Sequence, residues 1–210
     1  MEVNGVKVIE HFIPKSNTTS RPGYPMKPEY ITVHNTGNNK EGANARMHTK
    51  YIDTAAGYIS WHFTVDDKEI YQELPCNEVA WHAGDGGDGP GNRKSIGIEI
   101  CEVGDYKKAE DNAAALIVHL MRQYNIPLSN VVPHQKWSGK YCPRLILAAG
   151  WDKFIDLVKS KTQMSLKEAV EIIAGKVPGG LDVNLWAGDN KILKSQYIDT
   201  LLIKIAKAIK

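Results

Sequence analysis

Two histidines and one cysteine stand in settings that suit a metal ligand. His34 ends the apolar run 30–34 and His134 ends the run 130–134, so each is expected at the tip of a buried strand. Cys142 follows in a short turn-forming loop. Two imidazoles and one thiolate leave one position of a tetrahedral Zn²⁺ open, which is typical of catalytic rather than structural zinc sites. We therefore expect a zinc centre that does chemistry.

A carboxylate lies in a similar apolar setting. Glu99 belongs to the run 95–101, whose alternation places Ile96, Ile98 and Ile100 on one face of a predicted strand and Glu99 on the other. Burying a carboxylate in such a strand is costly unless it has a partner or a task. From the residues alone, Glu99 is either a solvent-facing position on an edge strand or a catalytic base.

Five motifs in a fixed order narrow these alternatives. They closely resemble motifs of the zinc-dependent N-acetylmuramoyl-L-alanine amidases of the phage T7 lysozyme and peptidoglycan-recognition-protein superfamily, above all the endolysins of Bacillus and Clostridium phages and prophages. The resemblance covers roughly residues 1–160. The motifs are ITVHNTG at 31–37, SWHFTVDD at 60–67, AWHAG at 80–84, SIGIEIC at 95–101 and PHQKWSGKYCP at 133–143.

The resemblance implies a reaction and a role for each candidate residue. The bond expected to be cut is the amide between N-acetylmuramic acid and L-alanine of the peptidoglycan stem peptide. His34, His134 and Cys142 would hold the zinc. Glu99 would be the catalytic carboxylate, and Lys140 would stabilise the charge of the transition state.

Other motif residues are expected near the substrate. The resemblance implies that His62, Trp81 and His82 line the cleft and contact substrate or order the site. Among these, His82 is the stronger candidate for binding, because Trp81 and a glycine-rich loop stand beside it. Some relatives use a tyrosine to handle protons, and Tyr58 is the phenol in this region of the sequence.

The periodicity of the chain indicates an α/β fold. We expect a central, mostly mixed β-sheet flanked by helices in a catalytic domain at residues 1–160. A β-hairpin is expected across a turn at 66–68. The predicted helices are at 41–52, 109–124 and from 151 onward, and the predicted strands include 60–65, 69–74 and 96–101.

The last fifty residues have a different character. After a linker at 161–165, residues 166–210 carry amphipathic helical patterns and more lysines than acidic residues. A unit of this size is marginal alone. We interpret it as a small helical domain that targets the cell wall, through anionic wall polymers, or that forms homo-oligomers.

Composition limits the remaining possibilities. The 210 residues carry a net charge of +2, show no nucleic-acid motif, and contain no apolar run long enough to span a membrane. Three cysteines without a paired motif do not indicate a disulfide framework. The first residues lack a secretory signal, so we expect synthesis in a host cytoplasm and later release to the cell wall.

Three alternatives share some of these features. A non-catalytic peptidoglycan-binding protein of the same superfamily would typically lack the cysteine ligand. A cysteine hydrolase would use Cys142 as its nucleophile and would not need a metal. A zinc endopeptidase cutting within the stem peptide would share the metal, but no His-Glu-x-x-His motif is present.

Overall fold

The computed structural model describes residues 2–162, 203 and 205–207. Residues 1–160 form one compact unit. The predicted helical domain at 166–210 lies almost entirely outside the described residues. The last helix of the described region continues to Thr162, and the rest of the predicted linker at 161–165 lies outside the described residues.

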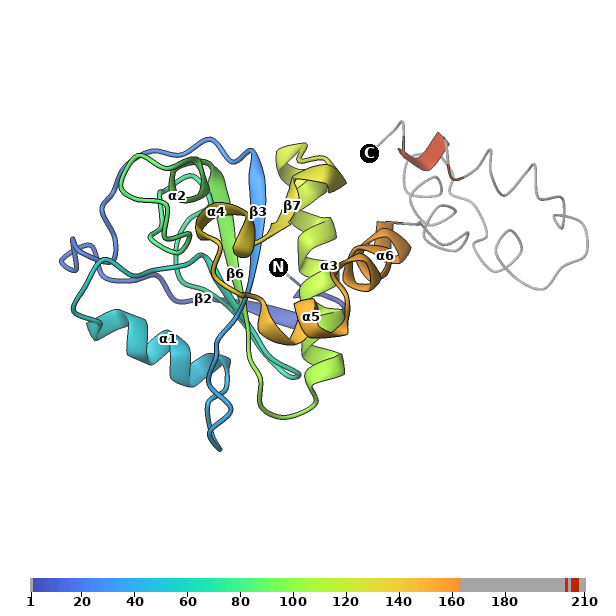
Figure 1. Ribbon diagram of the computed structural model, residues 1–210, viewed down its shortest axis with the longest axis horizontal. Helices are drawn as coiled ribbons and strands as arrows, with labels where there is room; N and C mark the ends of the chain where they lie inside the picture. Colours follow the sequence, from blue (N-terminus) through green and yellow to red (C-terminus); the bar gives the residue numbers. More distant parts are fainter. Residues whose placement is uncertain (1, 163–202, 204, 208–210) are drawn as a thin grey trace, which may run out of the picture. The chain divides into compact units, whose positions relative to one another are not determined.

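A seven-stranded mixed sheet forms the centre of this unit (Figure 1). Its strand order is β1-β2-β5-β4-β6-β3-β7, with parallel pairing of β3 to β6 and β7 and antiparallel pairing of β4 to β5. The predicted α/β class and the predicted hairpin are confirmed. The strands are β1 (Glu2–Val3), β2 (Val6–Glu10), β3 (Tyr30–Asn35), β4 (Phe63–Val65), β5 (Ile70–Gln72), β6 (Ser95–Ile100) and β7 (Val131–Pro133).

Helices cover both faces of the sheet. In Figure 1, α3 and α6 lie on one side of β3 and β6, and α1, α2 and α4 lie on the other. The helices are α1 (Ala45–Thr54), α2 (Pro90–Lys94), α3 (Tyr106–Tyr124), α4 (Gln135–Ser138), α5 (Arg144–Ala149) and α6 (Trp151–Thr162), with a 3-10 turn η1 (Leu128–Asn130).

Two helices begin at capping residues and not where the sequence pattern placed them. The side chain of Asn44 accepts a hydrogen bond from the backbone of Met47, so α1 begins four residues later than the predicted start at 41. The side chain of Asp105 caps α3 in the same way, and this helix begins three residues earlier than predicted. The short caps, and not the hydrophobic periodicity, therefore define both starts.

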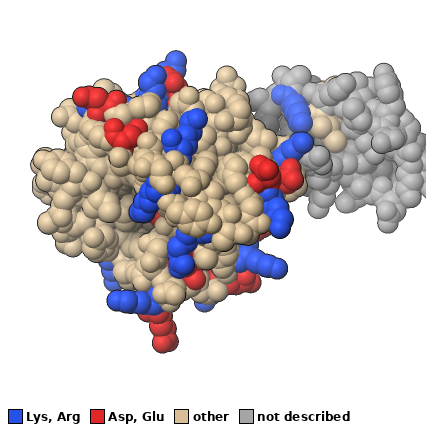
Figure 2. All heavy atoms as spheres, in the orientation of Figure 1, with Lys and Arg blue, Asp and Glu red and all other residues tan. Residues whose placement is uncertain are grey.

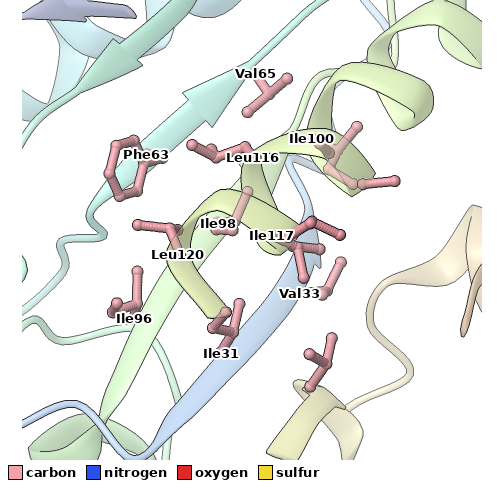
Figure 3. Packing of buried hydrophobic residues seen from close by; sticks show 14 of the residues in the cluster. Ile31, Val33, Phe63, Val65, Ile96, Ile98, Ile100, Leu116, Ile117 and Leu120 are labelled. Atoms are coloured by element: carbon pink, nitrogen blue, oxygen red, sulfur yellow. The ribbon is translucent and has the colours of Figure 1, made fainter. Parts of the chain in front are cut away.

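The two faces of the central strands differ in character. The side chains at alternate positions of β3, β4 and β6 are apolar and pack against α3 (Figure 3). Between them, Thr32, His34, Thr64, Gly97 and Glu99 face the opposite side. The residues labelled in Figure 3 are Ile31, Val33, Phe63, Val65, Ile96, Ile98, Ile100, Leu116, Ile117 and Leu120, all of them buried.

The register of the parallel strands gathers the predicted site residues. His34 on β3 lies directly beside Glu99 on β6. On the other side of β3, Val33 lies opposite Pro133, and the backbone N–H of His134 donates to the Val33 carbonyl at 3.2 Å. Because the carboxyl ends of parallel strands meet at one edge of a sheet, these three functional side chains reach the same place.

The surface of the described region carries charges of both signs. On the face seen in Figure 2, Lys and Arg side chains are interspersed with Asp and Glu. Within the described residues, no helix has the length and apolar character needed to cross a membrane.

Candidate active site

Three donor atoms converge at the carboxyl ends of β3 and β7. One nitrogen of His34, one nitrogen of His134 and the Sγ atom of Cys142 all lie within 4.8 Å of one another, and His34 Nδ1 is 3.8 Å from Sγ. Zn–N distances of about 2.0 Å and Zn–S distances of about 2.3 Å put neighbouring tetrahedral donors about 3.5 Å apart. The donor types and their spacing therefore fit a tetrahedral zinc ion with one open position.

A tight loop between α4 and α5 presents the cysteine. Gly139 ends α4 with a left-handed φ of 76°, a conformation that glycine adopts without strain. The backbone N–H of Cys142 then donates to the Lys140 carbonyl at 2.7 Å, and its own carbonyl accepts from Gln135 at 3.0 Å. These bonds turn the Cys142 thiol back towards the end of β3.

His82 determines which nitrogen of His34 faces the other donors. His34 Nε2 lies 3.0 Å from His82 Nδ1, and His82 Nε2 lies 3.1 Å from the Ser95 carbonyl oxygen. Because a carbonyl can only accept, His82 Nε2 carries the hydrogen, His82 Nδ1 accepts, and His34 Nε2 donates. His34 Nδ1 therefore keeps its lone pair on the side of Cys142, as in metal-binding histidines whose second nitrogen is held by the protein.

Burial keeps the ligand set uncharged in the free protein. Desolvation is the main cause that lowers the pKa of His34 well below its usual value and also lowers that of His134. Among the described residues, neither nitrogen of His134 has a hydrogen-bond partner of ordinary geometry, although the Ala83 carbonyl lies nearby. Burial raises the pKa of Cys142 to about 11. A zinc ion requires donors of this kind, namely neutral imidazoles with available lone pairs and a thiol that loses its proton on binding.

Glu99 lies next to these ligands with an unused oxygen. Its Oε1 is 3.8 Å from His34 Nδ1, and its buried Oε2 has no hydrogen-bond partner in the part of the chain that the structure describes. Desolvation raises the pKa of Glu99 to about 8, while the positive charge of Lys140 acts in the opposite direction. Glu99 therefore faces the site, which excludes the solvent-facing alternative from the sequence.

Two polar residues that the sequence analysis did not single out hold the ligand segments together. Asn35 follows His34, accepts from the backbone N–H of Leu145 at 3.0 Å and donates to the Tyr106 hydroxyl at 3.0 Å. Glu102 accepts from the Gly37 backbone N–H at 3.2 Å and from two nitrogens of Arg144. Both therefore tie the end of β3 to the segment that follows Cys142.

The donor cluster opens into a cleft of about 870 Å³. His34, Glu99, His134 and Lys140 contribute to its lining, as do aromatic side chains and the glycine-rich loop before α2. The other lining residues are Tyr24, Tyr58, Ile59, Trp61, Trp81, His82, Gly84, Gly86, Gly87, Asp88, Asn92, Arg93 and Ser138.

The sequence profile of the N-acetylmuramoyl-L-alanine amidase family matches residues 24–145, which include every predicted ligand and catalytic residue. The chain belongs to this amidase family. The mixed sheet, the ligand cluster and the cleft described above are therefore those of a family member.

Similar amidases occur in Bacillus subtilis. The N-acetylmuramoyl-L-alanine amidase CwlH of strain 168 is 57% identical over 157 residues, which are 74% of this chain and 62% of CwlH. The amidase XlyA of the same strain is 58% identical over 151 residues, which are 71% of this chain and 50% of XlyA. The chain thus matches between half and two thirds of the length of these two relatives.

Solved structures have the same fold. The catalytic domain of XlyA superposes with a TM-score of 0.70 at 56% identity, and the match covers 73% of this chain and 99% of that domain. The structure of PlyL gives a TM-score of 0.67 at 46% identity, over 73% of this chain and 97% of PlyL.

One of the residues expected to contact substrate in this amidase-family chain does not reach the cleft. His62 is fully buried, accepts from the Gly97 N–H at Nδ1 (3.0 Å) and donates from Nε2 to the Glu78 carbonyl (2.9 Å). Burial lowers its pKa to about 4. Of the two roles expected for His62, the structure contradicts contact with substrate and agrees with ordering of the site, because both ring nitrogens already bind backbone groups.

Trp81 and His82 do line the cleft, but in different ways. His82 is mostly buried and its two nitrogens are occupied by His34 and Ser95, so it orders the site. Trp81 contributes to the lining of the cleft, and its Nε1 has no acceptor within residues 2–162. The backbone of residues 82 and 83 is held by Asn92, whose Oδ1 accepts from both N–H groups at 2.8 Å.

Gly97 offers a test of the role of His82. A Cβ at Gly97 would lie 2.8 Å from His82 Cγ, so Gly97→Ala must displace that ring and disturb its bond to His34. We expect Gly97→Ala to lower the affinity for Zn²⁺ by about 10- to 100-fold, measured by competition with a chromogenic chelator. Gly87→Ala is the control, because a Cβ there meets nothing within 4 Å. Equal affinities of both variants and the wild type would show that His82 does not orient the ligand.

Proposed function

We propose that this chain is a zinc-dependent N-acetylmuramoyl-L-alanine amidase, which hydrolyses the amide between N-acetylmuramic acid and L-alanine of the stem peptide. The observation that carries the proposal is the convergence of two imidazoles and a thiol beside a buried carboxylate, at a cleft that His34, His134 and Glu99 line. The family of the chain and the amidase names of its relatives supply the bond.

His34, His134 and Cys142 would hold the metal. When bound, Zn²⁺ supplies Lewis acidity that activates water for attack and polarises the substrate carbonyl. His82 keeps His34 in the tautomer that ligation needs. The presence of all three candidate ligands supports this function over that of a binding-only protein of the same superfamily.

Glu99 is proposed as the general base. Its free Oε2 can accept a proton from the attacking water and pass that proton to the departing amine nitrogen. A pKa near 8 in the free cleft lies close to neutral pH, where one group can both accept and return a proton. Glu99 would be ionised more readily beside the zinc ion that the three ligands would hold.

Lys140 is proposed as the electrostatic partner of the reaction. It lines the cleft and is close enough to influence the pKa values of Glu99 and Cys142. An ammonium group there would stabilise the negative oxygen that forms as water adds to the carbonyl. The C–N bond then breaks, leaving a carboxylate on the muramic acid and a free amino group on L-alanine.

The biological setting that fits this reaction is bacterial cell-wall lysis. Peptidoglycan would be the partner, and the chain would act at the wall as a phage or prophage endolysin or as an autolysin. One matched structure of a similar protein is described as a mutant endolysin from Bacillus subtilis.

The bond can be identified by digesting purified bacterial wall and analysing the products by mass spectrometry. We expect free L-alanine amino termini and intact glycan chains, with activity lost on chelation and restored by zinc. New amino termini elsewhere in the stem peptide would indicate an endopeptidase. Activity that survives chelation but is lost on thiol alkylation would indicate a cysteine hydrolase.

The base can be tested by replacing its carboxylate. We expect Glu99→Gln to retain zinc and fold but to lose about 10²- to 10⁴-fold in kcat, because the amide side chain cannot accept the proton. Glu41→Gln, on an exposed carboxylate outside the cleft, is the matched control. Near-normal turnover of Glu99→Gln would remove Glu99 from the mechanism.

We also propose that residues 166–210 form a small helical module that binds the wall, through anionic polymers, or that forms oligomers. The excess of lysine in this segment supports binding to an anionic surface. Its role is separate from the catalytic unit at residues 1–160.

Truncation separates the two roles. A chain ending at Thr162, where α6 ends, should hydrolyse purified wall at a rate within about twofold of the full chain, because the cleft residues are retained. The amount of truncated chain that sediments with intact cells should be at least several-fold lower than that of the full chain. This difference should shrink as the salt concentration rises, because screening weakens the binding of the full chain. Equal sedimentation of both chains would contradict wall targeting.

A further inference from the structure

A buried carboxyl that does not line the cleft takes no part in the proposed reaction. Glu73 directly follows β5, and its backbone N–H donates to the His62 carbonyl at 2.9 Å. Its side chain is completely buried. Burial raises the pKa of Glu73 well above its usual value, because the ionised form would lose its hydration. A buried acid of this kind needs a partner or a task.

The contacts of Glu73 with α1 require a hydrogen from the carboxyl. Thr49 Oγ1 on α1 lies 2.9 Å from Glu73 Oε1 and 2.9 Å from the Ala45 carbonyl oxygen. A threonine hydroxyl carries one hydrogen, and a carbonyl oxygen can only accept. Two full hydrogen bonds at the Thr49 hydroxyl therefore need a second hydrogen, which a protonated Glu73 supplies.

On its other side, Glu73 approaches β4. Thr64 Oγ1 accepts from Trp61 Nε1 at 2.7 Å, which leaves the hydrogen of the Thr64 hydroxyl available to an acceptor. This hydroxyl lies close enough to influence the pKa of Glu73, although Glu73 Oε2 has no hydrogen-bond partner of ordinary geometry in the described part of the chain. A neutral carboxyl can accept from Thr64 and donate to Thr49, whereas a carboxylate can only accept.

These groups connect the wall of the cleft to α1. The connection runs from the Trp61 indole through Thr64, Glu73 and Thr49 to the Ala45 carbonyl. Trp61 lines the cleft, and hydrogen bonds that follow one another in a buried setting strengthen each other. We propose that Glu73 is a positioning residue, which bridges Thr64 and Thr49 as a neutral acid and thereby fixes Trp61 in the cleft wall.

The neighbouring carboxyl agrees with a neutral bridge. Thr64 on β4 lies directly beside Glu99 on β6, and the charge of Glu99 adds to the rise in the pKa of Glu73. Two ionised carboxyls near one buried threonine would repel each other. The neutral form of Glu73 avoids this repulsion.

The protonation state can be measured by infrared difference spectroscopy of the full chain. Glu73→Gln keeps a donor and an acceptor of similar size but removes the acid. In a Glu99→Gln background, where Glu99 cannot contribute, this change should remove a C=O stretching band of a protonated carboxylic acid at neutral pH. Glu41→Gln in the same background is the matched control and should remove carboxylate bands only, because Glu41 is exposed. Loss of carboxylate bands alone in Glu73→Gln would overturn the inference.

The positioning role can be measured at the indole of Trp61 by NMR. In the wild type and in Glu73→Gln, the bond to Thr64 should slow the exchange of the indole hydrogen with solvent. Glu73→Met has a similar length but no hydrogen to donate, and it should speed this exchange about 3- to 10-fold. Exchange at the wild-type rate in Glu73→Met would overturn the inference.

Resting on the proposed function, the same variants should separate binding from turnover. Glu73→Gln should keep the KM for a soluble muramoyl peptide within about twofold of the wild type. Glu73→Met should raise this KM about 3- to 10-fold, with kcat changed less than about threefold, because the proposed ligands and base are retained. Equal KM values of the two variants would overturn the role of a neutral bridge in the cleft.

Two possible failures leave the inference testable. The infrared measurement needs only Glu73→Gln, so it decides the state of the bridge even if Glu73→Met does not fold. Cleavage by none of the proteins would remove the proposed function, while the infrared and indole measurements would still confirm or overturn the role of Glu73.

Discussion

The parallel pairing of β3 with β6 is the constraint on which the site depends. It fixes His34 beside Glu99, and the alternation of the same strands sends their apolar side chains into the core under α3. A shift of one residue in this register would turn the functional side chains into the core. The free energy gained by burying Ile31, Val33 and Ile98 therefore also holds the proposed metal-binding and catalytic side chains in place.

The polar face of the sheet is buried almost as deeply as the apolar one. Desolvation is the first cause of every pKa shift among His34, His82, Glu99, His134 and Cys142, and in each case it favours the neutral form. These groups can be buried here because they are uncharged in the absence of a metal. A divalent cation would instead favour the ionised forms of the thiol and the carboxyl. Burial thus prepares the cluster for a positive ion.

Local patterns predicted the sheet, the hairpin and the side of the strand that carries Glu99, because alternation and apolar runs depend only on residues that are close together in the sequence. Cys142 was proposed from its loop setting and supported by the motif resemblance, because a cysteine eight positions after a histidine is by itself weak evidence for a metal site. Asn35 and Glu73 escaped notice because their partners are distant in sequence. The error at His62 has a related cause: a motif identifies a residue, but backbone contacts decide whether it faces substrate.

The ties made by Asn35 and Glu102 have a thermodynamic consequence for metal loading. Because they already join the end of β3 to the segment after Cys142, the binding of an ion does not have to order that loop. Nearly all of the intrinsic free energy of metal binding should then appear in the measured affinity, because little of it is needed to order the loop. The gain in thermal stability would follow free zinc concentration by simple mass action. The end of β3 and the segment after Cys142 would therefore have the same fold with and without the proposed zinc ion.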